Sequence, residues 1–76
     1  MGLADVFAEV FEEPAENFTD ASNRESVLGW TSMRHVTLLV RIENEYGTRF
    51  SNAEMATLRS MSDIRTALAS KGVTVS

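Results

Sequence analysis

Apolar residues recur at helical spacing through residues 32–46, where they occupy much of the helix circumference. At about 100° per residue, one stripe consists of Leu38, Leu39, Ile42 and Tyr46. A second set widens the apolar arc to roughly twice the width that one core contact requires: Met33, Val36 and Val40. We predict a helix from Ser32 to Tyr46 that ends at Gly47 and that either lies between neighbours or presents one flank to a partner.

Three other segments carry helix signals. The first places five apolar residues on one face before Pro14 stops the helix: Leu3, Val6, Phe7, Val10 and Phe11. Ser51 and Glu54 form a capping box, which predicts a short helix after them. Ser60 begins a last helix that ends near Gly72 and turns three apolar residues inward: Met61, Ile64 and Leu68.

Residues 14–31 form a long polar connection, and such a connection in a small domain is either functional or packed by its own side chains. Four apolar residues can supply that packing: Phe18, Val27, Leu28 and Trp30. We therefore expect an ordered loop that lies over the helices. No strand alternation is present, so the predicted fold class is all-α: a four-helix bundle with three long helices and one short third helix. It forms a single domain, residues 1–76, with a frayed tail at 73–76.

Composition excludes several classes of function. The chain has 76 residues, no cysteine and a formal net charge of −4. Without cysteine it has no disulfides or thiolate metal sites, and one histidine without a loop of oxygen ligands gives no predicted metal site. The acidic balance disfavours a nucleic-acid partner, including a small helix-turn-helix binder, because phosphate contacts need a basic surface. No apolar run has membrane-spanning length, so a cytoplasmic location is the default expectation.

Catalysis needs positioned titratable groups, and the chain offers few. His35 is the only histidine and follows Ser32 by one helical turn, so the two could be neighbours. A Ser–His pair also needs an orienting acid and an oxyanion hole, for which the sequence has no candidate. We therefore assign no catalytic residue. We interpret His35 as a partly buried, hydrogen-bonded side chain and Trp30 as an anchor of the long loop.

Ser32 is chemically suited to more than helix capping. From the residues alone, its hydroxyl is interpreted as an ordinary N-cap at the start of the predicted helix. The first backbone N–H groups of a helix have no partner within the helix, and the helix dipole is positive at that end. Both features would hold a phosphodiester attached to this hydroxyl, so the position suits a covalently attached anion.

Residues 28–33 read Leu-Gly-Trp-Thr-Ser-Met. This segment resembles the Leu-Gly-x-Asp-Ser-Leu attachment motif of the acyl carrier protein family, which includes carrier domains of polyketide and nonribosomal peptide assembly lines. The resemblance covers nearly the whole chain, with further similar segments at 42–47, at Phe50 and at 58–64. In that family the motif serine is esterified by phosphopantetheine from coenzyme A, whose thiol carries acyl groups as thioesters. The resemblance therefore implies an acyl-carrier-like bundle with phosphopantetheine on Ser32.

The resemblance also implies a docking surface on the second helix, made of Met33, Val36, Thr37, Val40, Glu43 and Asn44. The chain departs from the family pattern at Thr31, which replaces the usual aspartate, and at Met33, which replaces leucine. Arg34 and Arg41 make the helix more basic than in relatives, which favours a dedicated pathway. A tryptophan two residues before the serine, here Trp30, resembles the motif of a subset of free-standing carriers of secondary metabolism.

The function that this resemblance implies is an acyl carrier protein that delivers thioester-bound intermediates in polyketide, fatty-acid-like or hybrid secondary metabolism, including antibiotic biosynthesis. The implied partners are a phosphopantetheinyl transferase, an acyl- or aminoacyl-loading enzyme and a ketosynthase or other biosynthetic enzyme, all acting on a monomer. Two alternatives stay open: an aminoacyl or peptidyl carrier protein, and an unmodified carrier-like protein-interaction module, for which Thr31 is the sequence support.

Overall fold

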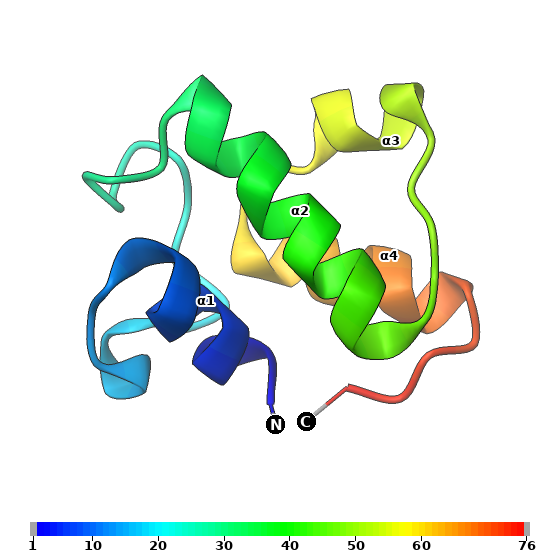
Figure 1. The fold of residues 1–76 in the computed structure, drawn as a ribbon, viewed down its shortest axis with the longest axis horizontal. Coiled ribbons are helices and arrows are strands. Elements are labelled where there is room, and N and C mark those ends of the chain that lie inside the picture. Colours follow the sequence, from blue (N-terminus) through cyan, green and yellow to red (C-terminus); the bar gives the residue numbers. More distant parts are fainter. Residues whose placement is uncertain (1, 76) are drawn as a thin grey trace.

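The computed structural model describes residues 2–75, which contain four α-helices, one 3₁₀ helix and no strand (Figure 1). The elements are α1 (Leu3–Phe11), η1 (Ala15–Asn17), α2 (Ser32–Tyr46), α3 (Asn52–Thr57) and α4 (Met61–Ser70). This arrangement confirms the all-α bundle with a short third helix and a long first loop. No helix of residues 2–75 combines the length and the apolar character needed to cross a membrane.

Helix α2 crosses the middle of the bundle, with α1 on one side and α4 behind it (Figure 1). Its inward stripe is completely buried at Leu38, Leu39 and Ile42. The helix ends at Gly47, whose φ of 62° is the left-handed conformation that glycine adopts without steric cost. The predicted bounds of this helix and its predicted core stripe are both confirmed.

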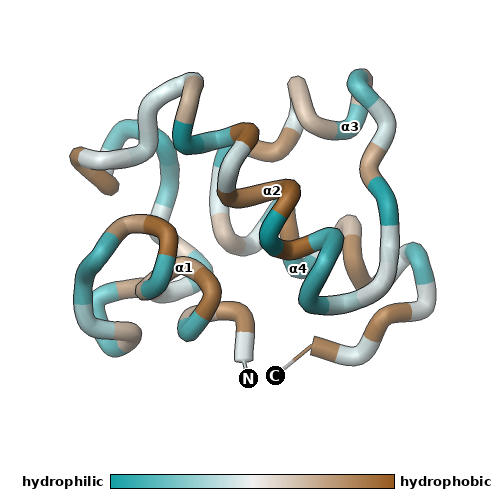
Figure 2. Tube along the Cα trace, viewed as in Figure 1, coloured by the Kyte–Doolittle hydropathy of each residue, from teal (hydrophilic) through white to brown (hydrophobic). Residues whose placement is uncertain are grey.

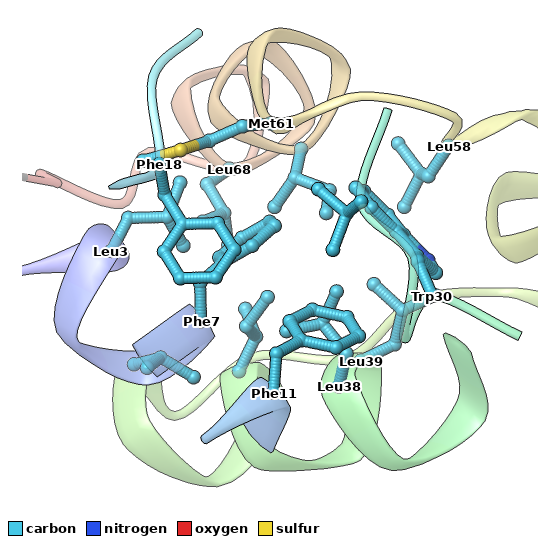
Figure 3. Packing of buried hydrophobic residues seen from close by; sticks show 14 of the residues in the cluster. Leu3, Phe7, Phe11, Phe18, Trp30, Leu38, Leu39, Leu58, Met61 and Leu68 are labelled. Carbon is cyan, nitrogen blue, oxygen red and sulfur yellow. The ribbon is translucent and has the colours of Figure 1, made fainter. Parts of the chain in front are cut away.

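An aromatic cluster fills the space between α1 and the long loop (Figure 3). The ring of Phe7 lies at its centre, 5.5 Å from Phe18 and 5.4 Å from Trp30 between centroids. The Phe7–Trp30 pair meets edge to face at 80°, a favourable geometry for two aromatic quadrupoles. Trp30 is 3% exposed, so its predicted role as an anchor of the loop is confirmed.

The long loop is ordered because its backbone pairs with the segment that precedes α4. Asn23 and Ser60 form an isolated antiparallel bridge. Next to it, the N–H of Arg24 donates to the carbonyl of Arg59 at 3.1 Å, and the N–H of Met61 donates to the carbonyl of Ser22 at 2.9 Å. These bonds satisfy polar backbone groups that would otherwise compete for water, so the loop packs as the sequence predicts.

The prediction that Leu28 packs against the helices is wrong, because its side chain is 95% exposed. The N–H of Trp30 donates to the carbonyl of Val27 at 3.0 Å and closes a tight turn. Val27 and Trp30, at the two ends of this turn, are buried, whereas Leu28 lies at the tip and points into solvent. The turn geometry therefore decides which of these apolar residues reaches the core.

The C-terminal part follows its predicted caps. The Ser51 and Glu54 side chains form the capping box of α3, and the Ser60 hydroxyl accepts the N–H of Asp63 at the start of α4. Lys71 lies at the end of α4 and pairs with Glu54 at 2.7 Å. Beyond it, Val73 and Val75 pack partly against the core, whereas Ser76 lies outside the described residues. Fraying of residues 73–76 stays a prediction.

Candidate functional site

Ser32 is the first residue of α2, and its side chain is exposed. The N-cap is Thr31, whose hydroxyl accepts the N–H of Arg34 at 3.2 Å. The interpretation of Ser32 as the capping residue is therefore wrong by one position. Thr31 has the extended backbone that an N-cap requires, with φ −84° and ψ 172°, whereas Ser32 is already helical. Because Thr31 caps the helix, the Ser32 hydroxyl is not used as the cap.

Two buried side chains fix the backbone around Ser32. The indole N–H of Trp30 donates to Nδ1 of His35 at 2.9 Å, and Nε2 of His35 lies 2.8 Å from the carbonyl oxygen of Met55. An indole can only donate and a carbonyl can only accept, so His35 is neutral and carries its proton on Nε2. The prediction of a hydrogen-bonded histidine is confirmed, and at 7% exposed His35 is more deeply buried than the partial burial predicted.

This hydrogen-bond pattern leaves no ring nitrogen of His35 for Ser32. Nδ1 is occupied by Trp30, and Nε2 donates across to the end of α3. A general base must reach the proton that it removes, either directly or through one water. His35, one helical turn after Ser32, thus has a structural role, in which it connects the loop, α2 and α3.

The first turn of α2 is also tied to α1. The Arg34 guanidinium donates to the carbonyl of Val10 at 2.9 Å, close to the end of α1. That carbonyl belongs to the last turn of the helix, where backbone acceptors lack an intrahelical donor. Together with Trp30 and His35, this contact holds the start of α2 against three other parts of the fold.

The surroundings of Ser32 favour an anion. The amide groups of Ser32 and Met33 have no hydrogen-bond acceptor within residues 2–75, as expected for the first turn of a helix. On the loop side, Nη2 of Arg24 lies 3.5 Å from the Ser32 hydroxyl oxygen, a long contact. Arg24 also lines a cleft of about 390 Å³ together with Asn23, Glu25 and Arg59. No group of three histidine or carboxylate side chains in this described part of the chain could hold a metal ion.

The second helix presents an apolar strip beside Ser32. Met33, Val36 and Val40 are 81%, 54% and 42% exposed, and Figure 2 shows hydrophobic stretches along α2. Thr37 and Asn44 are exposed as well. Of the six residues predicted for docking, Glu43 is the least available. It is partly buried, and its carboxylate accepts the N–H of Phe50 at 2.7 Å.

Two residues of the long loop before α2 were not predicted for this site. Leu28 adds an exposed apolar side chain on the turn before α2, and Arg24 adds a guanidinium from the loop. The Val27–Trp30 turn signal could have revealed Leu28, since a tip residue between two anchors points outward. Arg24 had no comparable signal, because its approach to Ser32 depends on the pairing of the loop with residues 59–61.

The sequence profile of the family described as "Phosphopantetheine attachment site" matches residues 2–68. Because the match covers most of the chain, the protein belongs to this family of phosphopantetheine-binding carrier domains, and its helical bundle is that of an acyl carrier protein. Its prosthetic group is covalently attached phosphopantetheine. Carrier domains of this kind work with a phosphopantetheinyl transferase and with biosynthetic enzymes. No curated protein sequence matches the chain significantly.

Proposed function

We propose that Ser32 carries the phosphopantetheine arm and that the protein is an acyl carrier, which holds acyl intermediates as thioesters and delivers them to partner enzymes. The observation that carries this proposal is the exposed Ser32 hydroxyl at the start of α2, freed from capping by Thr31. The residues around it fit the group, because unpaired amides and the Arg24 guanidinium face the position of an attached phosphate.

The chain's own residues supply attachment, orientation and docking. Thr31 caps the helix, while Trp30 and His35 hold the turn before it in one conformation, so the hydroxyl is presented outward. The attached arm supplies the thiol to which acyl groups are bound. The side-chain partner of the Ser32 hydroxyl within residues 2–75 is a donor, Arg24, so transfer of the arm depends on the transferase, and the later chemistry depends on the partner enzymes.

The partners are proposed to dock on α2 at Met33, Val36, Thr37, Val40, Glu43 and Asn44. The exposure of the three apolar members supports this surface, because exposed apolar residues gathered beside a reactive group mark interaction sites. Glu43 contributes mainly through its bond to the Phe50 amide, which holds the chain after α2 in place. The proposed partners are the transferase, an acyl-loading enzyme and a ketosynthase or related biosynthetic enzyme, which meet the protein as a cytoplasmic monomer.

The experiment is incubation of the purified protein with a broad-specificity phosphopantetheinyl transferase and coenzyme A, followed by intact-mass measurement. We expect a mass gain of one phosphopantetheine in the wild type and none in Ser32→Ala. Ser51→Ala is the matched control, since Ser51 also stands at a helix start but its hydroxyl is bound to the amide of Glu54. A wild-type protein that gains no mass, or a gain that survives Ser32→Ala, would contradict the proposal.

A further inference from the structure

We propose that Arg24 binds the phosphodiester of the arm and so positions the prosthetic group over the cleft between the long loop and the segment before α4. This inference rests on the proposed attachment at Ser32. It adds Arg24 as a ligand for the phosphate. Arg24 is eight residues before Ser32 in the chain and lies outside both the attachment segment and the α2 docking surface.

The geometry of Arg24 points to this role. Its Nη2 atom lies 3.5 Å from the Ser32 hydroxyl oxygen, which is too long for a strong hydrogen bond to a neutral hydroxyl. The phosphorus would be bonded to that same oxygen, so its non-bridging oxygens fall within reach of the same guanidinium. Arginine binds phosphate through charge-assisted, often bidentate bonds that are shorter and stronger than a contact to a neutral hydroxyl.

The backbone of Arg24 is held firmly enough to position a ligand. Its N–H donates to the carbonyl of Arg59 at 3.1 Å. Before it, the Asn23 side chain accepts the amides of Glu25 and Ser26 at 2.8 and 3.0 Å, which fixes the following turn. An arginine on a backbone anchored in this way loses less freedom when it binds than one on a mobile loop would lose.

The charge of Arg24 is not neutralised by a carboxylate within residues 2–75. The salt bridges of this part of the chain use Arg41, Arg65 and Lys71, and none includes Arg24 or Arg59. The cleft that Arg24 lines is therefore bordered by two arginines, Arg24 and Arg59, and by one acidic residue, Glu25. A net positive cleft in an otherwise acidic chain is suited to the phosphate end of the arm.

The test uses the protein loaded with phosphopantetheine, whose mass is verified first. We expect the arginine Nε–H resonance of Arg24 in ¹H–¹⁵N spectra to shift between the apo and loaded wild-type protein. In ³¹P spectra, we expect the phosphodiester resonance of loaded Arg24→Gln to differ in chemical shift from the wild type and to have a longer transverse relaxation time. Added salt should move the wild-type resonance toward that of the variant, because salt screens an exposed ion pair.

Arg49→Gln is the matched control. It removes the same charge at the far end of α2, about 20 Å from Ser32 along the helix axis. Its ³¹P resonance should match that of the wild type, and Arg24→Lys should give an intermediate result because the charge is kept. A loaded Arg24→Gln protein with a wild-type ³¹P shift and salt response, or an unmoved Arg24 Nε–H, would overturn this inference alone. A wild type that gains no mass would overturn the proposed function as well.

Discussion

Truncation of Leu39 and of Met33 should separate the core face of α2 from its docking flank. Leu39 is completely buried in the stripe that faces the other helices, whereas Met33 is 81% exposed one turn or more away on the same helix. Removal of a buried leucine side chain costs about 2–5 kcal/mol, because apolar burial is lost and a cavity remains. Truncation of an exposed side chain stays within about 0.5 kcal/mol.

The size of the chain makes this difference easy to detect. A domain of this length has a free energy of unfolding of roughly 4–11 kcal/mol, so Leu39→Ala removes a large share of it. For a domain this small, the lower limit of the loss corresponds to a fall in Tm of at least about 8 °C. Ile42→Val gives a milder test on the same face, with an expected loss of about 0.5–1.5 kcal/mol.

The assay is urea unfolding followed by tryptophan fluorescence. Trp30 is the only tryptophan and is 3% exposed, so its emission reports the loss of the packed core. The same variants are then compared as substrates of the transferase. Met33→Ala should lower kcat/KM about fivefold or more, equivalent to about 1 kcal/mol of lost interface contact. Equal losses of stability at Leu39 and Met33, or unchanged transfer to Met33→Ala, would refute the assignment of the two faces.

Substitutions at two further positions test the local chemistry of α2. Thr31→Ala should lower the free energy of unfolding by about 0.5–2 kcal/mol, because the cap on the Arg34 amide is lost. Thr31→Asp should retain the cap. Thermal melts followed by circular dichroism would show both effects. Tyr46→Phe should keep or raise stability at neutral pH, because the Tyr46 hydroxyl is buried without a hydrogen-bond partner within residues 2–75. Burial, and secondarily the charge of Glu45, raises the pKa of Tyr46, so its titration leaves the free energy of unfolding unchanged below the unfolded pKa near 10 and lowers it as the pH rises from there through the folded value. Urea titrations above pH 9 should therefore show a smaller decline for Tyr46→Phe than for the wild type, and an identical decline would contradict this assignment.

The helices could be predicted because their signals are local. The apolar repeat and Gly47 define α2, and the capping box at Ser51 and Glu54 defines α3. Each of these signals consists of residues that lie close together in the sequence. The cap of α2 was predicted one residue late because Thr31 and Ser32 both carry hydroxyls that could fill the role. The choice depends on which residue has extended backbone, and the burial of Trp30 immediately before Thr31 sets that conformation.

The parts of the site that come from the loop could not be predicted, because they depend on contacts between distant segments. Hydrophobicity predicts that Leu28 is buried, but a turn of four residues has a tip that cannot face the core. Arg24 approaches Ser32 only after its backbone has paired with Arg59, which is 35 residues later in the chain. No periodic pattern links residues at such a separation.

The charges on and around α2 do not all face a partner, which changes how its basic character should be interpreted. The sequence places two arginines, Arg34 and Arg41, on α2. In the folded protein, Arg34 binds the Val10 carbonyl and Arg41 pairs with Glu9, so both guanidinium groups bind α1. An incoming enzyme therefore meets a largely apolar strip on α2, and the guanidinium of Arg24, which has no salt bridge within residues 2–75, lies beside Ser32. Partner selection would then depend on the shape of the Met33–Val40 strip, while the proposed role of Arg24 is to bind the phosphate.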